Sequence, residues 1–133
     1  MKTNCKVVGY ILEQNGKILV QRKDEYGKLS ASCFSLPFVF VTSDVCDNDV
    51  VKTEIERQFG IADIKEFSPV FATSFRTDST SAMFYYVKLC RSVKVCDTMH
   101  EKWVLPETIL KESFGISCEV IDAYLKSKIQ VLY

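Results

Sequence analysis

Apolar residues along the chain gather in short runs that predict β-strands. Residues 7–12 and 18–21 are rich in apolar and β-branched side chains, and the Asn15-Gly16 pair between them is a strong turn signal. The sequence therefore predicts a hairpin near the start of the chain. Further apolar runs, each typical of a strand, cover residues 33–41, 64–75, 81–90 and the stretch before Pro106.

Proline interrupts three of these regions. Pro37 limits residues 33–41 to an edge strand, a bulge or two short pieces, because proline cannot donate a hydrogen bond to a sheet. Pro69 marks an interruption in residues 64–75. Pro106 suits the first position of a helix, so the strand before it is expected to lead into a helical turn.

Residues 47–60 show the clearest pattern of an amphipathic helix. Apolar residues recur at every fourth position and predict a buried stripe, formed by Val51, Ile55 and Phe59. Asp47 or Asp49 is expected to cap the N-terminus of this helix, where both favour the positive end of the helix dipole. Gly60 stands where a left-handed residue ends many helices.

A final helix is predicted over residues 117–129. Its apolar face consists of Val120, Ile121, Tyr124 and Leu125. The predicted order is three strands, a helix, three strands and a helix. This order implies an α/β (α+β) fold with a mixed β-sheet sandwiched between helices. At 133 residues the chain is expected to form a single domain over residues 1–133.

Charge and composition narrow the range of partners. Lys plus Arg and Asp plus Glu each number 17, so the formal net charge is zero. The chain therefore has no overall positive charge that would attract a nucleic acid polymer or an anionic membrane. No signal peptide or membrane-spanning run is expected, which favours a cytoplasmic location. The six cysteines lack zinc-ligand spacing, and their apolar surroundings predict buried free thiols.

The stretch SLPFVFVTSDVCDNDVVKTEIERQFGI, Ser35 to Ile61, resembles the signature box of the Nudix hydrolases. In that family the box is G-x5-E-x7-R-E-U-x-E-E-x-G-U, with U aliphatic, and it usually follows a Leu-Pro-Gly pattern. Leu36-Pro37 and Gly60-Ile61 fit this spacing without a gap. The resemblance extends to the first hairpin, the strand that contains Trp103 and the last helix. It therefore implies a Nudix-like, MutT-like fold over most of the chain.

The framework of the box matches the family, but most of its catalytic positions do not. The matching residues are Glu54, Ile55, Gly60 and Ile61. Phe38 and Val39 stand where the family has two glycines after the proline. Val45 takes the place of the isolated Glu, and Thr53 takes the place of the Arg. Arg57 and Gln58 replace the paired glutamates. One of the family's four metal-binding glutamates therefore remains.

These replacements bear directly on the family's chemistry. Nudix hydrolysis is a metal-assisted attack of water on a diphosphate, and Mg²⁺ or Mn²⁺ require carboxylate oxygens. Arg57 places a positive charge one turn from Glu54, where it repels a cation by about 4 kcal/mol per unit charge at 4 Å and a dielectric near 20. The resemblance therefore implies an impaired hydrolase. No cofactor is expected. Mg²⁺ or Mn²⁺ is expected only if hydrolase activity persists.

The first hypothesis is a non-catalytic module that binds a nucleotide or another small phosphorylated ligand. Arg57, Arg22 and Arg76 are its candidate ligand-binding residues, because guanidinium groups suit phosphate. Glu54 and Arg57 equally fit an ordinary surface ion pair, since they are three residues apart on a helix.

The second hypothesis is an active hydrolase of nucleoside diphosphate-linked substrates with a non-standard metal site. Glu54 is its candidate metal ligand, and Glu54 and Asp97 are its candidate catalytic residues. Asp97 lies six residues before Trp103, where several Nudix proteins carry an additional acid. Further acids for such a site are Glu101 and either Asp44 or Asp47. Asp97 also fits an ordinary polar loop.

The third hypothesis is a protein-interaction domain. Residues 37–41 are apolar, and an exposed apolar strand can pair with another chain. This hypothesis includes a homodimer.

Overall fold

The computed structural model describes residues 5–21, 34–61, 63–74, 80–94, 101–111 and 116–131. Within these ranges the strands are β1 (Cys5–Gln14), β2 (Lys17–Gln21), β3 (Phe38–Thr42), β4 (Ile64–Ser74), β5 (Ser81–Leu89) and β6 (Glu101–Val104). The helices are α1 (Asp47–Phe59), α2 (Pro106–Lys111) and α3 (Ile116–Val131). The predicted order is confirmed, and α2 takes the place of the helical turn expected at Pro106.

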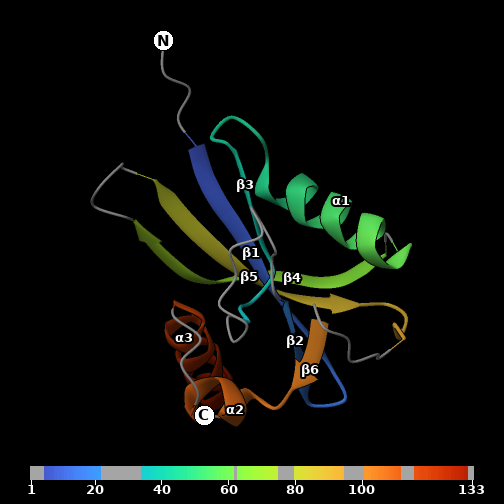
Figure 1. The fold of residues 1–133 in the computed structure, drawn as a ribbon, viewed down its shortest axis with the longest axis vertical. Coiled ribbons are helices and arrows are strands. Elements are labelled where there is room, and N and C mark those ends of the chain that lie inside the picture. The colour runs from blue at the N-terminus through green and yellow to red at the C-terminus, as the bar shows by residue number, and fades with distance from the viewer. Residues whose placement is uncertain are drawn as a thin grey trace.

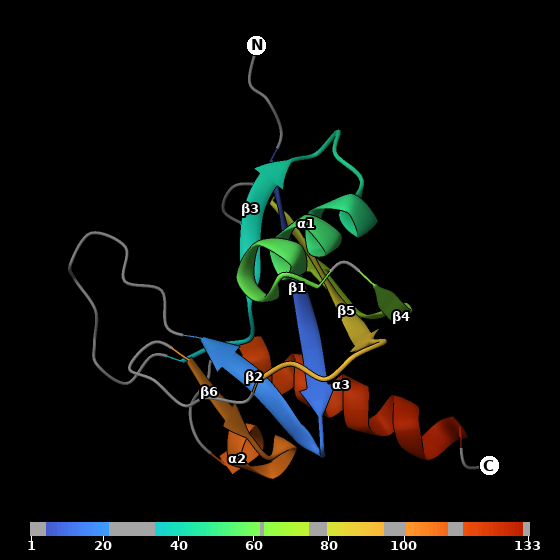
Figure 2. The same ribbon diagram turned by 90° about the vertical axis from the view of Figure 1, so that its right-hand side faces the viewer.

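The strands form one mixed sheet with β1 at its centre. β1 pairs in parallel with β5 on one side, and antiparallel with β3 and then β2 on the other. β4 lies beyond β5, and β6 lies beyond β2. α1 covers one face of the sheet and α3 covers the other (Figures 1 and 2). The predicted α+β sandwich is therefore confirmed.

Each face of the sheet has its own hydrophobic core, because side chains alternate along a strand. Val7 and Ile11 of β1 belong to the core that contains Ile121 of α3. Val8 and Leu12 belong to the other core, with Val51 and Ile55 of α1. The predicted buried residues of both helices are thus confirmed, except that Phe59 and Leu125 are only partly buried.

Pro37 divides the apolar run 33–41 into two short pieces, which is one of the three outcomes predicted for this proline. Ser35 forms an isolated bridge with Gln21, with backbone N–O distances of 2.7 and 2.8 Å. The Pro37 carbonyl then accepts a hydrogen bond from the Tyr10 N–H at 3.0 Å, and β3 begins at the next residue. The run therefore links the end of β2 to the first half of β1.

The ends of α1 agree only in part with the sequence pattern. Gly60 has a φ of 70° and its N–H donates to the Glu56 carbonyl, as expected for a left-handed cap. The expected cap by Asp47 or Asp49 is wrong, because Cys46 is the N-cap and makes no side-chain cap hydrogen bond. Asp47 instead contacts the sheet, as described below.

Gly9 of β1 allows a close approach of an aromatic ring from β5. A Cβ atom at this position would lie 2.2 Å from the ring of Phe84. Phe84 is 2% exposed and is the partner of Gly9 in the parallel pairing. The absence of a side chain at Gly9 is therefore required for the ring to enter the core.

The four cysteines in the described ranges do not follow the prediction of buried thiols, and Cys33 and Cys96 lie outside these ranges. Cys5, Cys46 and Cys90 are exposed and Cys118 is half-buried. Cys5, Cys46 and Cys90 lie where β1, α1 and β5 begin or end, outside the cores, whereas Cys118 lies within α3 and packs against the core of that face. Within the described ranges, no helix has the length and apolar character needed to cross a membrane.

Candidate functional site

The helix face that resembles the catalytic face of the Nudix box carries an internal ion pair. Arg57 Nε and Nη2 lie 2.8 and 2.7 Å from the same oxygen of Glu54, Oε2. The Glu54 side chain is 15% exposed, whereas the Arg57 side chain is 67% exposed. The carboxylate is therefore shielded and neutralised, while the guanidinium remains accessible to a ligand.

Gln58 is held by two other side chains. Its amide nitrogen donates to the Tyr10 hydroxyl at 3.1 Å, and its amide oxygen accepts a hydrogen bond from Gln21 at 2.5 Å. Burial raises the pKa of Tyr10, and the negative charge of Glu54 raises it further. The phenol is therefore neutral at ordinary pH and links β1 to α1.

The described acidic side chains of this region do not form a cluster that could coordinate a cation. Within the described ranges, no three side chains of His, Cys, Asp or Glu are grouped so that they could hold a metal ion. Glu54 is bound by Arg57, and Gln58 brings no charge. The described residues therefore do not fit the Mg²⁺ or Mn²⁺ cluster that a Nudix hydrolase requires.

Asp47, which the sequence makes a candidate for a relocated metal site, is held by the sheet. Its Oδ1 lies 2.5 Å from Lys6 Nζ of β1, and its Oδ2 accepts a hydrogen bond from the hydroxyl of Tyr85 on β5. Lys6 also donates to the Val45 carbonyl at 2.6 Å. These contacts fix the start of α1 and the loop before it, so Asp47 acts as an anchor.

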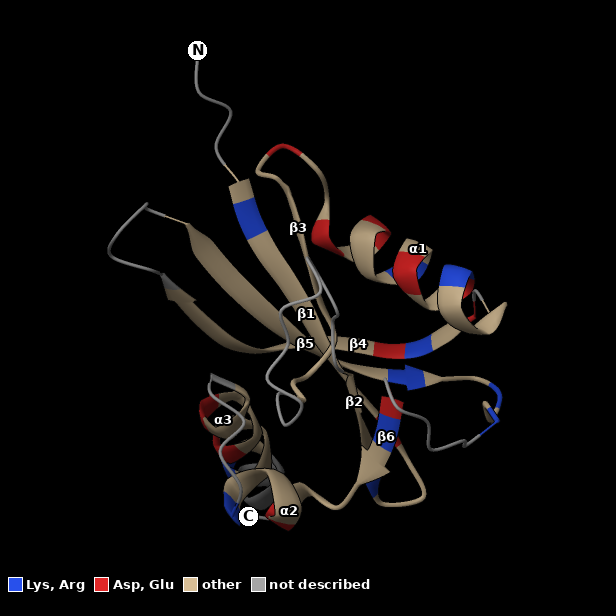
Figure 3. Cartoon of the chain, viewed as in Figure 1, with Lys and Arg blue, Asp and Glu red and all other residues tan. Residues whose placement is uncertain are grey.

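A groove of about 790 Å³ runs between β3 and α1. Apolar side chains of β3 and of the following loop form much of it, including Val39, Phe40 and Val45. Glu54 and Arg57 line the α1 side. Figure 3 shows acidic residues on the β3–α1 connection and along α1. This groove is the candidate functional site.

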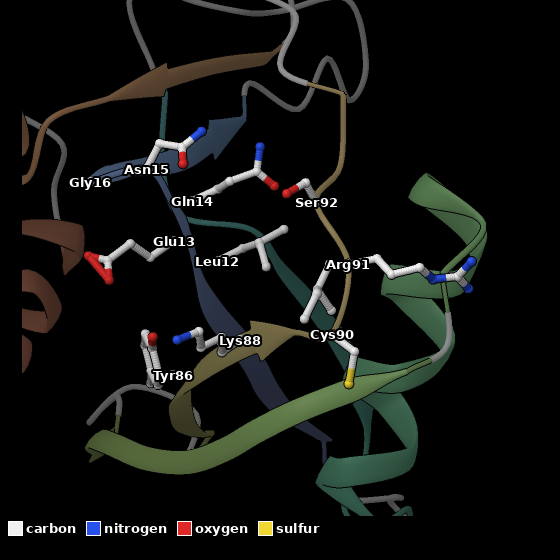
Figure 4. A pocket seen from close by; sticks show the side chains of 11 residues that line it. Leu12, Glu13, Gln14, Asn15, Gly16, Tyr86, Lys88, Cys90, Arg91 and Ser92 are labelled. Atoms are coloured by element: carbon white, nitrogen blue, oxygen red, sulfur yellow. The ribbon is translucent and has the colours of Figure 1, made fainter.

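A second cavity, of about 400 Å³, lies where the β1–β2 hairpin meets the end of β5. The Gln14 amide group spans one side of it, donating to the Val93 carbonyl at 2.8 Å and accepting from the Val93 N–H at 2.7 Å. In Figure 4 the Lys88 amino group points toward Tyr86, and the Arg91 side chain extends away from the cavity. Of the candidate site residues, Glu54 and Arg57 are described by the structure, and neither lines this cavity.

The structure brings together only part of the set expected from sequence. Glu54 and Arg57 are in contact, and Glu101 is close enough for its charge to raise the pKa of Tyr10 slightly. Arg22, Arg76 and Asp97 lie outside the described residues. Ser117, where the final helix was predicted to begin, accepts a hydrogen bond from the Leu36 N–H at 3.0 Å and is 1% exposed.

Sequence reasoning missed four residues that organise this site: Lys6, Tyr10, Gln21 and Tyr85. Tyr10 lies two positions from both Val8 and Leu12 in an apolar run, so the sequence does predict that the three side chains share one face of the sheet. The pattern does not reveal that Gln58 lies above it. Only the packing of α1 on the sheet brings these two residues together.

Comparison with known proteins identifies the fold. No family model and no curated protein matches the sequence. Solved structures do match. A mutT/nudix family protein from Listeria innocua has a TM-score of 0.71 and 13% identity, covering 98% of this chain and 96% of that chain. The chain therefore has the Nudix fold, which confirms the resemblance at the level of architecture.

Two further neighbours are structures of complexes. The NUDIX domain of Shewanella oneidensis NrtR, complexed with ADP ribose, has a TM-score of 0.68 and 11% identity, covering 96% of this chain and 90% of that chain. The C-terminal domain of mouse MUTYH, complexed with human PCNA, has a TM-score of 0.71 and 14% identity, covering 94% of this chain and 90% of that chain. At these identities the likeness concerns the fold alone.

Proposed function

We propose that this chain is a non-hydrolytic binding module with a Nudix fold, whose binding site is the groove between β3 and α1. One observation carries the proposal: the Arg57 guanidinium binds the only carboxylate that the box retains. The helix face that would hold a metal ion in a Nudix hydrolase thus holds an ion pair of its own.

The ion pair opposes metal binding in two ways. A cation that binds Glu54 must first displace Arg57 from Oε2, to which two nitrogen atoms donate. The displaced guanidinium then repels the cation. For a divalent ion 4 Å away, this repulsion ranges from about 2 kcal/mol in water to about 8 kcal/mol at a dielectric near 20. Because Arg57 is largely exposed, the lower part of this range applies.

Gln58 adds to the same effect. In the family this position carries a second carboxylate, whereas here a neutral amide is bonded to Tyr10 and Gln21. A metal ion would therefore find one oxygen ligand from the box, where six are usual for Mg²⁺. Water molecules can complete a coordination shell, but they do not supply the negative charge that holds the ion.

The neighbours support binding as a role for this fold. One Nudix-fold domain is complexed with ADP ribose, and another domain of the same shape is complexed with the protein PCNA. For the present chain, the hypothesis of a phosphorylated ligand rests on Arg57, Arg22 and Arg76. Of these, Arg57 lines the groove and the other two lie outside the described residues, so the hypothesis remains a prediction.

The proposal is tested by metal titration and by a substrate panel. Calorimetry with Mg²⁺ and with Mn²⁺ is expected to give no binding heat at Glu54. Nucleoside diphosphate-linked substrates are expected to release neither phosphate nor a nucleoside monophosphate. Metal-dependent hydrolysis by the wild-type chain that disappears in Glu54→Gln would instead establish a working hydrolase.

A further inference from the structure

Exposed apolar side chains concentrate along the groove between β3 and α1. In the part of the chain that the structure describes, the exposed large apolar residues are Phe40, Val45, Leu105 and Leu110. Two of these four, Phe40 at 66% exposed and Val45 at 38%, line the groove. Such a concentration of apolar surface is typical of a binding site for another molecule.

The same groove is acidic. Asp44, Asp49 and Glu54 line it together with Arg57, and this gives three carboxylates against one guanidinium, a formal net charge of −2. The whole chain has a net charge of zero, so the groove is a local feature. Since Glu54 is already paired with Arg57, the exposed Asp44 and Asp49 carry the remaining negative charge.

The walls of the groove are fixed before any ligand arrives. Lys6 holds the Val45 carbonyl at 2.6 Å and the Asp47 carboxylate at 2.5 Å. These two contacts tie the loop that contributes Asp44 and Val45 to β1, just before α1 begins. A preformed wall reduces the conformational entropy that binding would otherwise lose.

We infer that this groove docks a segment of a partner polypeptide that combines large apolar side chains with Lys or Arg. The inference rests on the proposed non-catalytic role of this helix face and names the partner class. Apolar side chains of the segment cover Phe40 and Val45, and its basic side chains approach Asp44 and Asp49. Complementary charge of this kind gives specificity as well as a faster encounter.

Charge also argues against two other occupants. A phosphorylated ligand would bring negative charge into a groove of net charge −2, whose one guanidinium already neutralises Glu54. A second copy of this chain, docked groove to groove, would bring the same net charge of −2 to the contact. A basic segment is the occupant whose charge the groove complements.

The length of the groove sets the size of the segment. Asp49 and Arg57 are eight positions apart on α1, which corresponds to about 12 Å along the helix axis. An extended chain covers this distance in about four residues. A short linear segment is therefore sufficient to fill the groove.

Binding of two short labelled peptides to the full chain, measured by fluorescence polarisation, tests the inference. Both peptides contain the same Leu and Trp residues, and their polar positions are Lys in one and Glu in the other. The Lys peptide is expected to bind at least about tenfold more tightly. Phe40→Ala and Asp49→Lys are each expected to weaken its binding by about tenfold.

Glu56→Lys is the matched control for Asp49→Lys. It makes the same charge change on an exposed residue of α1 that does not line the groove, and binding is expected to change less than twofold. Asp44→Lys provides a second charge reversal, on the exposed loop. Melting temperatures of all variants verify that each one is folded.

Three results would overturn the inference. One is equal or absent binding of the two peptides. Another is a rise in melting temperature with ADP that Arg57→Ala abolishes, which would assign the groove to a phosphorylated ligand. The third is a concentration-dependent dimer that Phe40→Ala disrupts. None of these results bears on the metal titration, which tests the non-hydrolytic role separately.

Discussion

Lys6 on β1 and Asp47, the first residue of α1, form an ion pair with a distance of 2.5 Å between Nζ and Oδ1. Both side chains are largely buried, at 17% and 20% exposed, and the Tyr85 hydroxyl donates to the second carboxylate oxygen. Through this contact the sheet determines where α1 begins, and with it the position of the groove wall.

Asp47→Asn is expected to destabilise the chain by about 1–3 kcal/mol. The substitution removes the charge that compensates a shielded Lys6 ammonium, and charged hydrogen-bonded groups contribute in this range. Urea denaturation measures the change. Asp122→Asn is the control, because its pair with Lys126 on α3 is exposed and is expected to contribute less than about 1 kcal/mol. Equal effects of the two substitutions would show that Asp47 is no anchor.

Gly9→Ala is expected to destabilise the chain by at least about 1–3 kcal/mol, the range for overpacking a core. The new Cβ would lie 2.2 Å from the Phe84 ring, and a buried ring in a β-strand has little room to move. Urea denaturation of Gly9→Ala, Phe84→Leu and the double variant measures the coupling. The double variant is expected to lose less than the sum of the two single losses, because Leu leaves space for the added methyl group. Strict additivity would contradict this explanation.

Much of the fold could be predicted from the sequence, because its determinants are local. The Asn15-Gly16 turn lies between β1 and β2, and Asn15 has the positive φ of 54° that such turns require. The four-residue spacing of Val51 and Ile55 identified the buried stripe of α1. The helix N-terminus could not be predicted in the same way, because Asp47 contacts Lys6, 41 positions earlier in the chain, in preference to the helix backbone.

The candidate site was predictable only where its contacts are local. Glu54 and Arg57 are three residues apart on a helix, so their ion pair could be expected from spacing alone. The contact of Gln58 with Tyr10 spans 48 positions and depends on how α1 packs on β1. The acidic groove likewise depends on β3 and α1 lying side by side, which no local pattern encodes.

The stability of the chain is expected to decrease above pH 10. Burial is the main cause that raises the pKa of each of four tyrosines above the usual 10.0: Tyr10, Tyr85, Tyr86 and Tyr124. In the unfolded chain these phenols lose their protons near pH 10, while the folded chain retains them. The stabilisation is therefore complete below pH 10 and is lost as the pH rises above it.

Melting temperatures measured between pH 8 and pH 11 test this dependence. Tyr10 is 2% exposed and is expected to contribute up to about 1.4 kcal/mol per pH unit above pH 10. Tyr10→Phe is therefore expected to give a shallower decrease than the wild-type chain, whatever its stability at pH 8. An unchanged slope in Tyr10→Phe would show that this phenol ionises equally in both states.

The double substitution Arg57→Glu with Gln58→Glu is expected to create metal binding. It places carboxylates at positions 54, 57 and 58, which lie on one face of α1, and it removes the guanidinium that binds Glu54. Calorimetry is expected to show Mn²⁺ binding at least about tenfold tighter than in the wild-type chain. Arg57→Gln, which removes the positive charge without adding a carboxylate, is expected to give a smaller gain. Adding Glu54→Gln to the double variant is expected to abolish binding. If the wild-type chain bound Mn²⁺ as tightly as the double variant, the Glu54–Arg57 pair would be no obstacle to the metal, and the non-hydrolytic role would lose its main support.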